Sequence, residues 1–160
     1  MALTKGVNTY ATLAEAGDYF VTRLDAAAWS SASPEQQEAA LVTATNMLDT
    51  LVFNGRTSGA SQPLMWPRTL RYLNPYSNRF EEVVPTEIPR RLTVATLEMA
   101  HHLLNNDGLT DDTGRVSKVV IGELEVDGLS QPALFPKVVM DNISLFLKPG
   151  STSLKWWRAN

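Results

Sequence analysis

Cysteine is absent from this chain of 160 residues, and histidine occurs only twice. Without cysteine the chain can form neither a disulfide nor a thiolate metal site, so an apolar core has to stabilise the fold. The two histidines, His101 and His102, are adjacent, and neighbouring helix positions point about 100° apart. They therefore do not predict a shared metal ligand set, and we interpret them as surface histidines on a helix.

Long hydrophobic runs and a strong excess of charge are also missing. The N-terminal stretch MALTKGVNTY has no apolar core of signal-peptide length, and no segment approaches the roughly 20 apolar residues of a membrane span. The formal net charge is -3, which argues against a strongly basic nucleic-acid-binding protein. We expect one soluble domain, made inside a cell and without a membrane partner.

The chain contains no sequence motif of an enzyme or a cofactor site. Neither G-x-G-x-x-G nor a P-loop is present, and no Ser/His/Asp or Cys/His arrangement can be argued. The acidic run 107–112 lacks the ligand spacing, the fixed glycine and the closing glutamate of an EF-hand loop, so it predicts a solvated turn. We expect no catalytic residue, no metal and no cofactor.

Four segments have the apolar spacing of helices. Two begin at capping boxes: 13–24 after Thr12 and 34–52 after Ser33. A third begins near Thr86 and runs to about 104. Its polar strip through Arg91, Glu98, His101 and Asn105 is so narrow that we expect a central helix buried on two sides. A last short helix is predicted over roughly 134–148.

The remaining segments predict loops and one extended stretch. Residues 54–63 are rich in turn formers, 69–85 are predicted to be irregular, and 116–126 alternate as a strand does. The predicted fold is therefore mainly α, a small helical bundle with long loops, a short β-like segment near 116–126 and a C-terminal tail. Residues 1–108 would form the core, and 109–160 an extended segment, short helix and C-terminal arm of the same domain.

A Trp-Pro-Arg triplet lies at the end of the long turn-rich loop. Trp66 is large and apolar, and we expect it to anchor this loop onto the helices. Pro67 would stiffen the exit from the loop. Arg68 would face an acidic partner or a helix end.

Cations and aromatic residues alternate just after this triplet, at Arg68, Arg71, Tyr72, Tyr76 and Arg79. This composition is typical of surfaces on which single-stranded nucleic acid stacks. The same residues would also suit a long loop that its aromatic side chains pin to the helices while the arginines reach solvent. Both interpretations stay open at this point.

The polar tail ends in an aromatic and basic cluster, Lys155, Trp156, Trp157 and Arg158. Tryptophan can bury on the order of 200 Å2, so two of them are costly to leave in water. The tail could fold back onto its own domain, or it could anchor in a partner, where tryptophan and arginine are favoured. We favour the partner.

The order of short segments along residues 8–105 resembles that of tailed-phage head–tail connector proteins, the adaptor or head-completion class. Some members of this class carry the label DnaT-like single-stranded-DNA-binding protein. The segments that carry the resemblance are YATLAEA at 10–16, YF at 19–20, Trp29, EAALVTAT at 38–45, LD at 48–49, FNG at 53–55, QPLMWPR at 62–68, VP at 84–85, IP at 88–89 and LEMA at 97–100.

The resemblance implies a structural virion protein without catalysis or a cofactor. Its subunits would form a ring, typically a dodecamer, below the portal protein, and would extend the DNA channel and support a tail or neck protein. Genomic DNA would pass through without specific binding, and a mildly acidic wall would suit this, since it does not attract phosphates. The protein would be found in the virion neck, and in the host cytoplasm during assembly. The family label implies the alternative, a single-stranded-DNA-binding protein.

Overall fold

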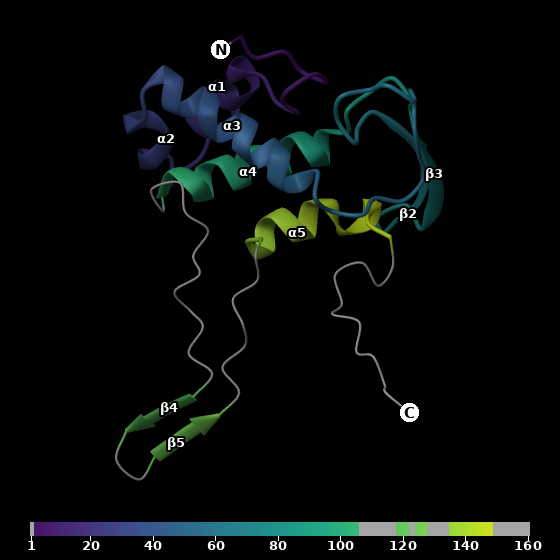
Figure 1. Cartoon of the computed structure of the whole chain (residues 1–160). Helices are drawn as coiled ribbons and strands as arrows, with labels where there is room; N and C mark the ends of the chain where they lie inside the picture. Colours follow the sequence, from purple (N-terminus) through teal and green to yellow (C-terminus); the bar gives the residue numbers. More distant parts are fainter. Residues whose placement is uncertain (1, 106–117, 122–123, 128–134, 149–160) are drawn as a thin grey trace.

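The computed structural model describes residues 2–105, 118–121, 124–127 and 135–148, and Figure 1 shows their arrangement. The described elements are α1 (Leu13–Val21), α2 (Ala27–Ser31), α3 (Pro34–Leu48), β1 (Arg56–Thr57), β2 (Arg68–Asn74), β3 (Arg79–Val83), α4 (Arg90–Asn105), β4 (Lys118–Ile121), β5 (Leu124–Asp127), α5 (Lys137–Ile143) and a 3-10 helix, η1 (Ser144–Phe146). None of the described helices is both long enough and apolar enough to cross a membrane.

The fold mixes helices with an antiparallel sheet, so the predicted mainly-α bundle is wrong. Strands β1, β2 and β3 pair in that order and lie at one end of the helical layer formed by α3, α4 and α5 (Figure 1). The error lies in residues 69–85, which were predicted to be irregular and instead form most of β2 and all of β3.

The β2–β3 hairpin escaped prediction because few of its residues are apolar and a proline interrupts it. In β2 burial alternates, with Leu70 buried and Arg71 exposed, but polar side chains dominate the exposed positions. The Asn74–Pro75 pair marks the hairpin turn and does not mark a loop without structure. Asn78 takes a positive φ of 51°, a conformation that asparagine tolerates better than most residues.

The helix starts follow the sequence more closely. Thr12 and Ser33 both form complete capping boxes, as predicted, with Glu15 and Gln36 as the reciprocal partners. The two helices end earlier than predicted, at Val21 and Leu48. Helix α2 was predicted only as a connector, although its Trp29 is buried and stacks on Phe20 at 4.7 Å between ring centroids.

Helix α4 lies at the centre of the helical layer, as its two apolar stripes predicted. Helices α3 and α5 pack against it on two sides (Figure 1). Leu92, Ala95 and Met99 are fully buried. The helix begins at Arg90, later than the predicted start near Thr86, and the carbonyl of Pro89 accepts the amides of Leu92 and Thr93.

Two members of the predicted polar strip on α4 are buried, because partners from α1 and the residues after it cover them. Glu98 accepts hydrogen bonds from the Tyr19 hydroxyl and the Arg23 guanidinium. His101 is 3% exposed, so its interpretation as a surface histidine is wrong. Its ring lies 5.5 Å from that of Phe20 between centroids. A buried carboxylate with two donors is far less costly than an unpaired one.

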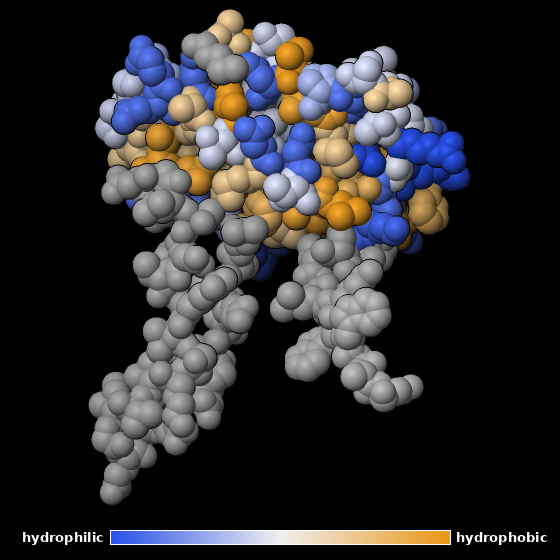
Figure 2. All heavy atoms as spheres, in the orientation of Figure 1, coloured by the Kyte–Doolittle hydropathy of each residue, from blue (hydrophilic) through white to orange (hydrophobic). Residues whose placement is uncertain are grey.

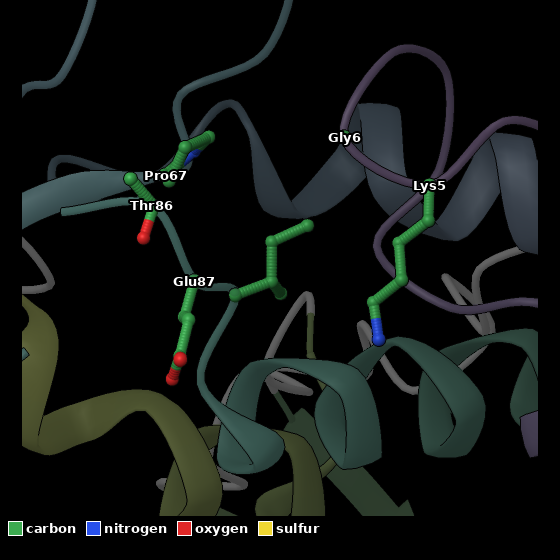
Figure 3. A pocket seen from close by; sticks show the side chains of 6 residues that line it. Lys5, Gly6, Pro67, Thr86 and Glu87 are labelled. Carbon is green, nitrogen blue, oxygen red and sulfur yellow. The ribbon is translucent and has the colours of Figure 1, made fainter. Parts of the chain in front are cut away.

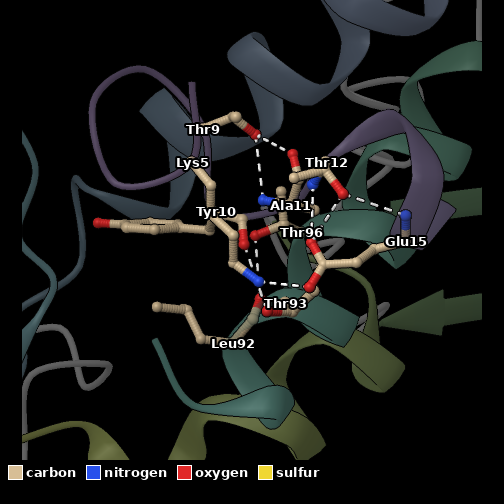
Figure 4. A network of polar contacts seen from close by, with 9 residues as sticks. All are labelled: Lys5, Thr9, Tyr10, Ala11, Thr12, Glu15, Leu92, Thr93 and Thr96. Carbon is tan, nitrogen blue, oxygen red and sulfur yellow. Dashed lines mark hydrogen bonds and ion pairs between the residues drawn. The ribbon is translucent and has the colours of Figure 1, made fainter. Parts of the chain in front are cut away.

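The segment before α1 is fastened to α4 and α1 by polar contacts (Figure 4). The Thr93 hydroxyl donates to the carbonyl of Tyr10 at 3.2 Å, and Lys5 forms an ion pair with Glu15. Burial raises the pKa of Glu15. The hydrogen bonds from Lys5 and from the backbone of Thr12 lower this pKa by more than burial raises it, so the net shift is downward. These contacts place Tyr10, which is fully buried, against α3 and α4.

Strands β4 and β5 pair antiparallel, with Val119 opposite Val126. The predicted extended segment 116–126 therefore contains two strands where one was expected, and 116, 117, 122 and 123 lie outside the described residues. The predicted last helix is present as α5 followed by η1.

The buried His101 and Glu98 predict that acid destabilises the fold. Burial lowers the pKa of His101 from 6.5, and the nearby Arg23 and His102 add to this, while Asp25 and Glu98 oppose it. For Glu98, burial raises the pKa, but the hydrogen bonds from Arg23 and Tyr19 outweigh it and the net shift is downward from 4.5. Both groups therefore bind more protons in the unfolded chain than in the folded one, so stability falls as pH falls.

Urea unfolding between pH 7 and pH 4 measures this effect. We expect the free energy of unfolding to decrease below about pH 6.5 through His101 and again near pH 4.5 and below through Glu98. The variant His101→Gln should lose the first decrease and keep the second. A first decrease of unchanged size in this variant would contradict the role given to His101.

Candidate nucleic-acid interface

The β2–β3 hairpin has one face against the helices and one face toward solvent. Its register pairs Leu70 with Val83, and both are buried. Because side chains alternate along a strand, the pairs one residue further along point the opposite way. The outward pairs are Arg71 with Glu82 and Leu73 with Phe80.

Trp66 lies beneath the sheet and joins it to the rest of the core. Its indole is fully buried and packs edge-on against Phe53 and Phe146, with ring centroids 5.6 and 5.4 Å away. Phe146 also contacts the ring of Tyr72 at 5.4 Å, so one aromatic cluster supports the inner face of β2. The Trp66–Pro67 peptide bond is cis.

Arg68, the first residue of β2, is 4% exposed and binds backbone carbonyls. Its guanidinium donates to the carbonyls of Met65 at 3.2 Å, Phe53 at 3.3 Å and Gly55 at 3.2 Å. The prediction for Arg68 was an acidic partner or a helix end, whereas these three carbonyls belong to the loop that Arg68 closes. This leaves Arg68 unable to contact a nucleic acid.

Asp49, at the C-terminal end of α3, holds the same loop from the other side. Its carboxylate accepts hydrogen bonds from the Tyr10 hydroxyl and from the backbone amide of Met65, the latter at 3.1 Å. Burial raises the pKa of Asp49, although these two hydrogen bonds oppose the shift. The loop from 53 to 68 is thus fixed at both ends, and β2 begins from a rigid base.

The outer face carries an aromatic ring paired with a cation. Phe80 is 67% exposed, and the guanidinium carbon of Arg71 lies 5.5 Å from its ring centroid. Leu73, the cross-strand partner of Phe80, is also exposed. In Figure 2 strongly hydrophilic side chains gather over the end of the molecule that carries β2 and β3.

A second pair of the same kind lies at the hairpin turn. Tyr76 is 86% exposed, and the guanidinium carbon of Arg91, in the first turn of α4, lies 5.8 Å from its ring centroid. The exposed Arg79 follows at the start of β3. The hairpin therefore presents two exposed rings, each with one guanidinium, and a further cation between them in sequence.

Glu81 connects the hairpin turn to the strands. Its carboxylate accepts hydrogen bonds from Asn74 Nδ2 at 2.7 Å, Ser77 Oγ at 3.0 Å and the Tyr72 hydroxyl at 3.0 Å. These hydrogen bonds from Ser77, Asn74 and Tyr72 lower the pKa of Glu81, so it is ionised at neutral pH.

The structure separates the predicted cation–aromatic cluster into residues that face the core and residues that are exposed. Arg68 and Tyr72 point into the protein, and Arg71, Tyr76 and Arg79 are exposed. Two residues of this surface, Phe80 and Arg91, were not predicted from the sequence. Phe80 could have been found from its place in a polar strand, whereas Arg91 comes from another element and only the tertiary fold brings it to Tyr76.

Within the part of the chain that the structure describes, neither the other predicted site residues nor the pocket near the N-terminus adds to this surface. Lys155, Trp156, Trp157 and Arg158 lie outside the described residues. A shallow open pocket of about 540 Å3 lies between the N-terminal segment and the residues before α4 (Figure 3). Its one lysine, Lys5, is already paired with Glu15. Within the described ranges no group of three or more His, Cys, Asp or Glu residues could hold a metal ion.

A family model described as "Putative DnaT-like ssDNA binding protein" matches residues 2–149. Neither the curated proteins nor the solved structures include a match. The match confirms the DnaT-like part of the resemblance and extends it beyond residues 8–105. It does not support the head–tail connector class, which the family's description does not mention.

The aromatic cluster predicts a large loss of stability for Trp66→Ala. Removing a fully buried indole leaves a cavity under β2, and such truncations cost about 3–5 kcal/mol. Phe80→Ala is the matched control, because it removes an aromatic ring from an exposed position of the same hairpin. Urea unfolding of both variants checks this. An equal free energy of unfolding for Trp66→Ala and the wild type would exclude the anchoring role.

Proposed function

The chain belongs to this DnaT-like family, and on that premise we propose that it binds single-stranded DNA through the outer face and turn of the β2–β3 hairpin. The observation that carries the proposal is the pair of exposed rings, Phe80 and Tyr76, each with an arginine over it. Leu73 lies opposite Phe80 and extends its exposed apolar surface, and a contiguous apolar patch, unlike a single exposed residue, points to a ligand or partner site.

Each ring can take one unpaired base by stacking. The exposed side of the ring is open to a base, while the guanidinium over the ring adds a cation that can pair with the adjacent phosphate. Stacking contributes about 1–3 kcal/mol per base and depends little on sequence, since every base has a π-face. The proposed ligand is therefore single-stranded DNA without a strong sequence preference.

The charge of the protein determines how strongly the proposed DNA binding depends on salt. The net charge is -3, and the exposed glutamate Glu82 lies opposite Arg71 on the outer face. Arg71 and Arg91 lie over the two rings and the exposed Arg79 lies at the start of β3, so we count three arginines that can meet phosphates here. Single strands give a salt slope of about 0.7 per phosphate contact, so we expect a slope of about -2 in log affinity against log salt. Stacking would supply the larger share of the affinity.

Fluorescence anisotropy with a labelled oligo(dT) tests the proposal. We expect Phe80→Ala and Tyr76→Ala each to weaken binding by about 5-fold to 150-fold, the equivalent of one lost base stack. Leu24→Ala removes an exposed apolar side chain near α1 and α2, away from the hairpin, and should bind as the wild type does (Figure 1). Failure of the wild-type protein to bind at low salt, or wild-type affinity in both aromatic variants, would refute the proposal.

A second candidate is the head–tail adaptor ring. Support for it comes from the order of sequence segments that resembles connector proteins, and from the mildly acidic charge, which suits a channel through which DNA slides. In this proposal the partners are the portal protein, neighbouring subunits and a tail or neck protein, and the protein is located in the virion neck. The hairpin rings would then contact a protein neighbour and not DNA.

Co-sedimentation with the portal ring encoded in the same genome tests this second candidate. An adaptor should sediment with the portal at a fixed stoichiometry and bind oligonucleotides weakly. Removal of residues 151–160, which include Trp156 and Trp157, should abolish the association if the tail is the anchor. A protein that stays in the supernatant while it binds oligo(dT) would exclude the adaptor role.

A further inference from the structure

The hairpin turn that carries Tyr76 is held in place by a short chain of hydrogen bonds. The Asn74 side-chain oxygen accepts the backbone amide of Tyr76 at 2.9 Å, and the Asn74 carbonyl accepts the amide of Asn78 at 2.8 Å. The Asn74 amide nitrogen donates in turn to Glu81 at 2.7 Å. The orientation of Asn74, and through it the backbone at Tyr76, therefore depends on Glu81.

Glu81 is itself fixed from the body of the protein. The Tyr72 hydroxyl donates to its second carboxylate oxygen at 3.0 Å, and the Tyr72 ring packs against the buried Phe146. Ser77, on the far side of the turn, donates to the first oxygen at 3.0 Å. Three residues, two from β2 and one from the turn, thus converge on one carboxylate of β3 that faces the helices through Tyr72.

We infer that Glu81 is a positioning residue for the proposed single-stranded DNA site, where it holds the hairpin turn so that the Tyr76 ring stands ready over Arg91. This inference rests on the proposed function. It explains why an acidic residue lies next to a turn proposed to bind an anionic strand, since its carboxylate already accepts hydrogen bonds from three donors of the protein. A turn ordered in advance lowers the entropy cost of binding, because Tyr76 needs no ordering when the base arrives.

A purely electrostatic role and a positioning role of Glu81 predict opposite changes in oligo(dT) affinity when the residue is replaced by alanine. If Glu81 acted only through its charge, removing it would reduce repulsion of the phosphates, and both Glu81→Ala and Glu81→Gln would bind oligo(dT) more tightly. If Glu81 positions the turn, Glu81→Ala should bind more weakly than the wild type. Glu81→Gln should keep wild-type affinity or exceed it, because its carbonyl can still accept from Asn74 and Ser77 while its amide can donate to the Tyr72 hydroxyl.

Two further variants complete the binding experiment. Glu82→Ala removes the same charge from the outer face without touching the turn, and should bind as tightly as the wild type or more tightly. In a Tyr76→Ala background, Glu81→Ala should cause no further loss, since it acts through Tyr76. Tighter binding by Glu81→Ala, or a loss of the same size with and without Tyr76, would overturn the inference.

A readout without DNA separates this inference from the proposed function. Amide hydrogen exchange at Tyr76 and Asn78 should accelerate in Glu81→Ala and stay near the wild-type rate in Glu81→Gln, because both amides bind Asn74. Wild-type exchange in Glu81→Ala would overturn the positioning role whether or not DNA binds. Accelerated exchange in a protein that fails to bind oligo(dT) would confirm that Glu81 holds the turn while refuting the DNA-binding function, and with it the assignment of the turn to a DNA site.

Discussion

The burial of Trp66 between Phe53 and Phe146 is the interaction on which the placement of the sheet depends. It joins the two ends of the loop between α3 and β2 to the 3-10 helix η1, which lies far from them in sequence. The indole nitrogen has no hydrogen-bond partner among the described residues, and an unpaired buried donor costs about 1–3 kcal/mol. Two aromatic contacts and full burial offset this cost, so the core tolerates the unpaired indole nitrogen.

Because Trp66, Arg68 and Asp49 fix the base of β2, the outer face of the hairpin does not have to contribute to folding. A half-buried antiparallel sheet needs apolar residues only toward the core. The outer positions of Leu73 and Phe80 depart from that pattern, since both expose apolar surface that a purely structural sheet would replace by polar side chains. Arg71 over Phe80 and Arg91 over Tyr76 cover part of this surface and keep it compatible with water. Stability is supplied on one side of the hairpin, and the other side carries the surface proposed to bind DNA.

Local signals made the helices predictable, and tertiary contacts made the sheet and the site unpredictable. Thr12 and Ser33 mark the starts of their helices through capping boxes, which involve residues only three apart. The apolar stripes of α4 predict that this helix is buried. By contrast, β2 and β3 depend on the contact of Trp66 with Phe146, a residue far away in the sequence that no window around the strands contains. The same holds for His101, whose ring lies against that of Phe20 in α1, a residue far from it in sequence. Of the proposed interface, Arg71, Tyr76 and Arg79 were identified by composition, whereas the pairing of Arg91 with Tyr76 requires α4 and the hairpin turn to meet.

The two candidate functions place opposite demands on the same electrostatics. A single-strand binder needs local attraction, whereas a channel needs a wall that releases DNA. The net charge of -3 satisfies the second demand over the chain as a whole, and the arginines beside Phe80 and Tyr76 satisfy the first at one hairpin. Coulomb attraction between exposed charges fades over about 10 Å at 0.1 M salt, so a distant acidic surface does little to weaken contacts made at the rings themselves. Stacking is short-ranged and acts on the bases, so it adds DNA affinity at the rings without making a mildly acidic protein a general polyanion binder. Exposed rings, more than net charge, favour single-stranded DNA as the ligand of this fold.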